Sequence, residues 1–224
     1  MLNAVIFDFD GVIVDTEPLH YKAFQELLVP LGLGYSWEEY LERYIGFDDR
    51  DAFREAFRVH GRTLSDAELK KLIRGKGDAF LAIVSGGVAP YPGVAELIRS
   101  ISGRLPLALC SGALKSDIEP ILAGLGLTDA FDVKVTADEV AASKPDPESY
   151  RLAVRRLQER YPGKVEAAAS IAVEDTPAGI ASATGAGLKV LAVTNSYPRE
   201  KLTGASRVVN SLVGVDIEGL SLLV

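Results

Sequence analysis

The sequence predicts an α/β fold, a doubly wound parallel sheet with a small all-helical unit inserted after the first strand. In the second part of the chain, short apolar runs alternate with amphipathic helical patterns over about 130 residues, which is typical of βαβ units. In contrast, residues 16–84 show helical patterns and no convincing strand. We therefore expect a sheet core made of residues 1–15 and 85–224, and a helical domain made of residues 16–84.

The first predicted strand is a short apolar run that ends in two carboxylates, Asp8 and Asp10, followed by Gly11. A run of this length and composition fits a strand that is buried on both faces. Gly11 indicates that the strand stops and the backbone turns. Both carboxylates then lie at the carboxyl edge of the sheet, where open α/β sheets bind ligands. The alternative is a pair of surface acids on a loop.

The helical insertion begins at Asp15-Thr16-Glu17-Pro18, which combines a capping residue, an acid and a proline. An apolar stripe at i, i+3, i+4 and i+7 follows, formed by Phe24, Leu27, Leu28 and Leu31. Ser36-Trp37-Glu38-Glu39 and Ser65-Asp66-Ala67-Glu68 match the capping-box pattern and open two further helices. Another helix is expected at about residues 50–59.

The rest of the chain supplies the other strands and their connecting helices. Strands are expected at Leu107–Cys110, Val133–Val135, Ile171–Val173, Val190–Val193 and Arg207–Val209. Helices are expected from Pro92, from about Ser116 to Gly124, and with proline as the first helical residue at Pro147 and at Pro177.

Composition excludes several classes of protein. With 224 residues, 48% of them hydrophobic and 25% charged, the chain is long enough for one sizeable domain with a smaller appendage. A net charge of −7 argues against a nucleic-acid-binding surface. Cys110 is the single cysteine, so no internal disulfide or cysteine-rich metal site can form. The first apolar run is interrupted early by acids, which fits neither a signal peptide nor a membrane span. We expect a cytoplasmic monomer.

Polar residues follow the predicted strands in a pattern that suits phosphoryl transfer. Asp8 and Asp10 end the first strand, Ser111-Gly112 follows the second, Glu174-Asp175 follows the fourth, and Lys144 lies in a loop before a helix. In a parallel sheet these ends face one crevice. Carboxylate oxygens with open positions hold Mg²⁺, which screens the charge of a phosphate. A hydroxyl, backbone N–H groups at a helix start and a lysine can hold phosphate oxygens.

The motifs that carry these residues resemble the haloacid dehalogenase superfamily. Asp8-Phe9-Asp10-Gly11-Val12, Ser111, Lys144-Pro145-Asp146-Pro147 and Glu174-Asp175 stand in its order and spacing. The chain is most similar to the branch that contains phosphatases and β-phosphoglucomutase, with a helical cap after the first strand. The resemblance spans almost the whole chain.

The resemblance implies a role for each residue of these motifs. Asp8 would be the nucleophile that forms an aspartyl-phosphate, and Asp10 would protonate the leaving group and then activate water. Mg²⁺ would be held by Asp8, the backbone carbonyl of Asp10 and Asp175, with Glu174 in or near that shell. The phosphate group would lie beside Gly11, Ser111, Gly112 and Lys144.

Four further residues are weaker candidates for substrate binding. His20 would lie where the cap meets the core, although a solvent-facing histidine on a helix is an equal alternative. Arg50 and Lys76 stand at cap positions where relatives contact substrate, and plain surface charges are the alternative. Lys115 could reach the substrate or simply be a solvated lysine at a helix start.

Three functions are compatible with this pattern. The first is a Mg²⁺-dependent phosphatase of a small phosphorylated metabolite, such as a sugar phosphate or a phosphoglycolate-like acid. The second is a β-phosphoglucomutase, which shares every step up to the aspartyl-phosphate but returns the phosphoryl group to a sugar hydroxyl. The third is a phosphate-binding or signalling module without turnover. The filled catalytic positions favour an enzyme, and we favour hydrolysis over mutase activity.

Overall fold

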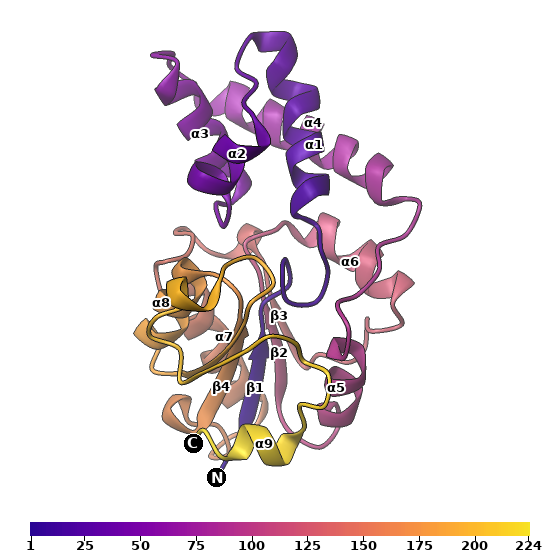
Figure 1. Ribbon diagram of the computed structural model, residues 1–224, viewed down its shortest axis with the longest axis vertical. Helices are drawn as coiled ribbons and strands as arrows, with labels where there is room; N and C mark the ends of the chain where they lie inside the picture. The colour runs from indigo at the N-terminus through magenta and orange to yellow at the C-terminus, as the bar shows by residue number, and fades with distance from the viewer. The chain divides into compact units, whose positions relative to one another are not determined.

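The computed structural model describes residues 1–224 and divides the chain into two compact units (Figure 1). The α/β unit consists of Met1–Asp15 and Ala89–Val224, and the helical unit consists of Thr16–Val88. Residues 85–88, expected in the α/β unit, belong to the helical unit. The reason is local: the Gly87 N–H donates to the carbonyl of Val84 (2.9 Å), which continues the end of the preceding helix.

The α/β unit contains a six-stranded parallel sheet in the order β3-β2-β1-β4-β5-β6. Its strands are β1 (Ala4–Phe7), β2 (Leu107–Cys110), β3 (Val133–Val135), β4 (Ser170–Glu174), β5 (Lys189–Val193) and β6 (Arg207–Val209). β1 lies in the middle, with Phe7 level with Leu109 on one side and Val173 on the other. The predicted doubly wound parallel sheet is thus confirmed, and β1, β2 and β4 are buried along their whole length, as their apolar sequences predict.

Helices cover both faces of this sheet. They are α5 (Val94–Ile101), α6 (Lys115–Gly124), α7 (Glu148–Arg160), α8 (Pro177–Gly185) and α9 (Ile217–Ser221). α7 packs on β2 and β3, and α8 on β4 and β5, while α5 and α6 lie on the other side of the strands (Figure 1). Alternate residues of β1, such as Ala4 and Ile6, join the core cluster under α7 and α8, as the two-residue period of a strand requires.

Two helix starts differ from the expectation, and one further helix was not anticipated. α5 begins at Val94, because Gly93 (φ 86°) forms its cap and leaves Pro92 outside the helix. Pro147 is the cap of α7 and not its first residue. α9 was not anticipated, although Asp216 caps it by accepting a hydrogen bond from the Gly219 N–H (2.7 Å).

The helical unit contains no strand, as predicted. It is built from α1 (Glu17–Leu28), a 3₁₀ turn (Val29–Leu31), α2 (Trp37–Glu39) with a π-helical turn (Tyr40–Tyr44), α3 (Asp49–Val59) and α4 (Asp66–Val84). The capping box at Ser65 is present. Leu31, expected on the apolar stripe of the first helix, is 40% exposed, because the α-helix tightens into a 3₁₀ turn before it. None of the helices has the length and apolar character needed to cross a membrane.

Candidate active site

The candidate site lies where the strand order reverses, at the carboxyl ends of β1 and β4. Asp8 follows β1, and its N–H donates to the carbonyl of Val173 (3.0 Å). Glu174 ends β4, and Asp175 follows it. Each of these three buried acids offers a carboxylate oxygen, and the three oxygens lie within 4.8 Å of one another. A reversal of strand order is the place where doubly wound sheets bind ligands, so the topology puts the acids in a crevice.

Lys144 joins these acids from the loop before α7. Its Nζ lies 2.8 Å from Oδ1 of Asp8 and 2.6 Å from Oε1 of Glu174, and it donates to the carbonyl of Cys110 (3.3 Å). An ammonium group has three N–H donors, so these three acceptors fix its position. The sheet thereby brings together residues that are 136 positions apart in the sequence, from Asp8 to Lys144.

Electrostatics at the cluster favour the binding of a cation. Lys144 alone cannot neutralise the buried carboxylates of Asp8, Glu174 and Asp175. Burial, and then repulsion from Glu174, raise the pKa of Asp8 to about 8, against the opposing effect of Lys144. Burial alone would lower the pKa of Lys144, but the carboxylates of Asp8 and Glu174 outweigh it and raise that pKa. The lysine therefore stays charged, and this single positive charge faces three buried acids.

Gly11 allows the closest approach in the site. Its φ is +76°, and a Cβ on this residue would lie 1.9 Å from Oδ2 of Asp175 and 2.7 Å from Oγ of Ser196. Its N–H donates to the carbonyl of Val14 (2.9 Å). The structure thus gives Gly11 a steric role beside Asp175, and its N–H is engaged by a backbone carbonyl.

Replacing Gly11 by alanine is therefore expected to remove most activity and to lower the free energy of unfolding by about 1–3 kcal/mol. The physical reason is that the methyl group must displace Asp175 while the backbone stays strained. Gly124→Ala is the matched control, because a Cβ there meets nothing within 4 Å and a helical alanine is well tolerated. Steady-state kinetics and thermal unfolding of both variants test this. A Gly11→Ala variant as active as Gly124→Ala would contradict it.

Asp10 and Ser111 meet at the neighbouring strand end. The Ser111 hydroxyl donates to Oδ2 of Asp10 (3.3 Å) and accepts from the N–H of Ala113 (3.0 Å). Ser111 is buried, while Asp10 is partly exposed. Gly112 comes next in the chain, and Lys115 is an exposed residue at the start of α6. Asp10 is therefore held next to Asp8 with its carboxyl group partly open to solvent.

His20 and Lys76 belong to the helical unit and are both buried, which contradicts a solvent-facing histidine and a surface lysine. Nζ of Lys76 lies 2.8 Å from Nδ1 of His20 and 2.9 Å from Oδ1 of Asp49. The lysine also lies over the rings of Phe24 and Phe80. An opposite charge and two ring faces compensate the cost of burying an ammonium group, so Lys76 can lie in the interior.

Arg50 has a local partner within the helical unit. Its Nε donates to Oδ2 of Asp48 (2.8 Å), and the same Asp48 caps α3 through the Asp51 N–H (2.9 Å). Arg50 is half-buried, so its guanidinium is held at the start of α3 and is not a freely solvated charge.

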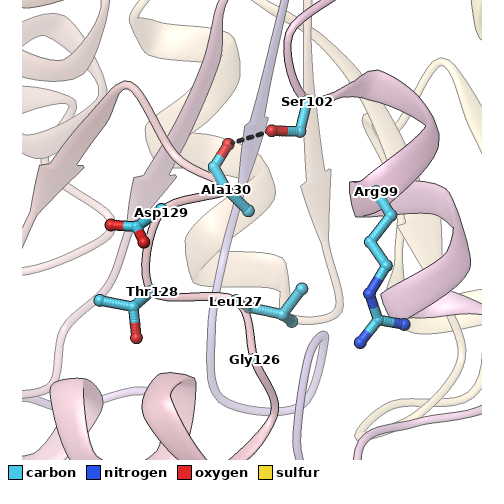
Figure 2. A pocket seen from close by; sticks show the side chains of 7 residues that line it. All are labelled: Arg99, Ser102, Gly126, Leu127, Thr128, Asp129 and Ala130. Atoms are coloured by element: carbon cyan, nitrogen blue, oxygen red, sulfur yellow. Dashed lines mark hydrogen bonds between the residues drawn. The ribbon is translucent and has the colours of Figure 1, made fainter.

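The thiol of Cys110 and a separate cavity contribute nothing to the cluster. Burial raises the pKa of the Cys110 thiol to about 12, so the thiol stays protonated and inert. A cavity of about 510 Å³ is lined by Arg99, Ser102 and residues 126–130 (Figure 2). It lies at the amino ends of β2 and β3, opposite the acids, and its Ser102 hydroxyl is bonded to the carbonyl of Ala130 (3.0 Å).

Three residues of these networks were not singled out from the sequence. Tyr150 donates its hydroxyl to Oε1 of Glu174 (2.7 Å), although its helical spacing with Ala153, Val154 and Leu157 indicates only a core position. Asn195 donates from Nδ2 to the carbonyl of Gly11 (2.7 Å). Asp49 pairs with Lys76, and the adjacent acids at 48 and 49, just before a helix, were the only signal for it.

A family model described as haloacid dehalogenase-like hydrolase matches residues 5–193. The chain belongs to this family. The predicted membership is thus confirmed, and with it the expectation of a hydrolytic enzyme. The match begins at β1 and ends at the last residue of β5, so it contains both halves of the acid cluster and the helical unit between the first two strands.

Individual relatives support the phosphatase and mutase branch. Fructose-1-phosphate phosphatase YqaB of Escherichia coli (strain K12) is 32% identical, over 84% of this chain and 95% of its own. A structure of a CbbY variant from Rhodobacter sphaeroides with xylulose-(1,5)bisphosphate has a TM-score of 0.87 at 29% identity, covering 98% and 99% of the two chains. A β-phosphoglucomutase from Clostridium difficile has a TM-score of 0.88 at 25% identity, covering 100% and 97%.

Proposed function

We propose that this protein is a Mg²⁺-dependent phosphatase of a small phosphorylated metabolite, acting through an aspartyl-phosphate on Asp8 as a cytoplasmic monomer. The observation that carries the proposal is the contact between Asp8 and Lys144 (2.8 Å) inside a buried acid cluster. A carboxylate can attack the phosphorus of a phosphate dianion only where positive charge offsets the repulsion between the two groups. The ammonium group of Lys144 supplies such charge beside Asp8.

The residues of the cluster fit Mg²⁺. Asp8 and Asp175 would hold it, together with the backbone carbonyl of Asp10, and all are hard oxygen ligands. The excess negative charge of the cluster supports this, because a divalent cation compensates the buried carboxylates that Lys144 leaves unbalanced. When bound, Mg²⁺ would neutralise charge on the phosphoryl oxygens and on Asp8.

The chain's own residues supply the remaining chemistry. Lys144 would orient Asp8 and offset the negative charge of the phosphoryl oxygens as the phosphorus–oxygen bond to the leaving group breaks. Asp10 would donate its proton to that leaving oxygen and then take a proton from the water that hydrolyses the aspartyl-phosphate. The hydrogen bond from Ser111 to Asp10 supports this role, because it holds the acid in place at the strand end next to Asp8.

The class of substrate is inferred from relatives. One acts on fructose 1-phosphate by its name, and another was solved with xylulose-(1,5)bisphosphate. We propose a sugar phosphate or a similarly small phosphorylated acid. In this proposal the helical unit acts as a cap domain that closes over the site and excludes water, and His20, Arg50, Lys76 and Lys115 bind the part of the substrate that is not phosphate.

A β-phosphoglucomutase is the second candidate, favoured by the TM-score of 0.88 to an enzyme of that name. It would use the same Asp8 and Asp10, so the acid cluster does not separate the two activities. The difference lies in the acceptor, which is water in a phosphatase and a sugar hydroxyl in the mutase.

A screen of sugar phosphates and phosphoglycolate with Mg²⁺ present tests the proposal. We expect release of inorganic phosphate, which falls to background after exhaustive treatment with EDTA and returns when Mg²⁺ is added. Conversion of β-glucose 1-phosphate to the 6-phosphate, dependent on a bisphosphate activator and without phosphate release, would favour the mutase. Full activity after chelation would remove the metal from the mechanism.

A further inference from the structure

Tyr150 contacts the acid cluster, yet the proposed chemistry does not use it. It is the third residue of α7, it is fully buried, and its hydroxyl donates to Oε1 of Glu174 (2.7 Å). Its ring also lies beneath the ammonium of Lys144, with Nζ 5.0 Å from the ring centre. The ring accounts for the packing and for the cation–π contact. Replacing Tyr150 by phenylalanine keeps the ring, so it isolates the effect of the hydroxyl group.

The hydroxyl completes the hydrogen bonding of Glu174. Oε1 accepts from Nζ of Lys144 (2.6 Å) and from Tyr150, which fills its two lone pairs. Oε2 accepts from the N–H of Asp175 (3.2 Å). The backbone of Gly179 lies so near that a Cβ there would be 1.9 Å from Oε2. Both oxygens of Glu174 are therefore held by protein groups, although the residue is part of the acid cluster.

We propose that Tyr150 is a positioning residue that sets the cation preference of the site, by keeping Glu174 from ligating the metal directly. This inference rests on the proposed divalent-cation site. With Glu174 engaged, the cluster offers the carboxylates of Asp8 and Asp175, and a cation bound there keeps several waters, as Mg²⁺ prefers. Without the hydroxyl, Oε1 regains a lone pair, and the carboxylate of Glu174 belongs to a cluster whose three ligand oxygens lie within 4.8 Å of one another. A third carboxylate then favours Ca²⁺, which takes six to eight oxygen ligands.

The test is direct binding of each cation to the metal-free, full-length protein by isothermal titration calorimetry. In Tyr150→Phe, the ratio of the Kd for Ca²⁺ to the Kd for Mg²⁺ is expected to fall by about tenfold relative to the unmodified protein, the lower end of what outer-shell partners of a metal contribute. Tyr161→Phe is the matched control. Tyr161 follows the last residue of the same helix, and its hydroxyl also donates to an aspartate, Oδ1 of Asp132 (2.6 Å).

A double-mutant cycle shows whether the effect passes through Glu174. In a Glu174→Gln background, adding Tyr150→Phe is expected to change the ratio of the two Kd values less than twofold. If Tyr150→Phe changes the ratio of the two Kd values equally with Glu174 and with Gln at position 174, the proposal is overturned. The loss of the hydroxyl would then act by loosening the fold. Thermal unfolding of each variant shows directly whether such loosening occurs.

The outcomes separate this inference from the proposed function. If the unmodified protein and Tyr150→Phe bind both cations with the same ratio, the role of Tyr150 is refuted and the metal-dependent phosphatase stands. If neither protein binds Mg²⁺ or Ca²⁺ at millimolar concentration, the metal site of the proposed function fails, and the inference fails with it.

Discussion

Replacing Asp8 by asparagine is expected to abolish turnover and, in the metal-free protein at pH 8, to raise the melting temperature. An amide cannot form the acyl-phosphate bond, so kcat should fall by roughly 10⁴-fold or more, as for other covalent nucleophiles. The gain in stability follows from the pKa of Asp8, which burial and Glu174 raise to about 8. In the unfolded chain this group ionises near its ordinary pKa of 3.8.

The sign of the pH dependence follows from proton binding. Between about pH 4 and pH 8 the folded protein holds a proton on Asp8 that the unfolded chain has lost, so stability falls as the pH rises. Asparagine removes this cost, which is on the order of a few kcal/mol at pH 8. With about 2–4 °C for each kcal/mol in a chain of this size, Asp8→Asn should melt roughly 5 °C higher in EDTA at pH 8, and by a smaller margin at pH 5.

Thermal unfolding at pH 5, 6.5 and 8 in EDTA measures the difference in melting temperature between Asp8→Asn and the unmodified protein. Glu26→Gln is the control, because Glu26 is an exposed acid in α1. Added Mg²⁺ should narrow the difference at pH 8, because it stabilises the protein that retains the Asp8 carboxylate. If the difference in melting temperature stays constant with pH, or if Asp8→Asn melts lower at pH 8, then Asp8 does not titrate as its burial requires.

Lys144→Met is expected to have the largest effect on stability, lowering the free energy of unfolding by about 3–5 kcal/mol in the metal-free protein at pH 8. The substitution leaves Glu174, which is fully buried, without the ammonium group 2.6 Å away. Activity should fall by at least about 100-fold, because Lys144 also orients Asp8 and offsets charge on the phosphate.

Lys115→Met provides the comparison, since Lys115 is exposed at the start of α6 and its loss should change stability by less than about 0.5 kcal/mol. Denaturant unfolding and steady-state kinetics of both variants give the two quantities. If Lys144→Met unfolds at the same denaturant concentration as Lys115→Met, the ion pairs of Lys144 do not stabilise the protein.

The strands of the core were predictable because their sequences carry the signal locally. The two strands at Leu107–Cys110 and Val133–Val135 have the predicted bounds, since short apolar runs between polar turns have few other uses in a folded chain. Helix starts were less exact. Whether Pro92 and Pro147 lie inside or before a helix depends on backbone angles at one neighbouring residue, which local composition does not specify.

The buried charges of the helical unit were not predictable. Lys76 has the same local sequence character as a surface lysine on a helix. Its burial depends on Asp49 and Phe24, which come from other helices, and on Phe80, which lies four residues further along its own helix. The hydroxyl of Tyr150 was hidden for a similar reason. Its spacing marks a core position, while its partner Glu174 is 24 residues away along the chain.

The sequence by itself determined the family, the parallel sheet and the acids and lysine at its carboxyl edge. The order of the motifs and the residues that follow each strand can both be read directly along the chain. Only the tertiary structure decided how these groups share charge and hydrogen bonds. The 2.8 Å contact of Lys144 with Asp8, the close approach of Gly11 to Asp175 and the hydrogen bond from Tyr150 to Glu174 all depend on packing between segments that are distant in the sequence.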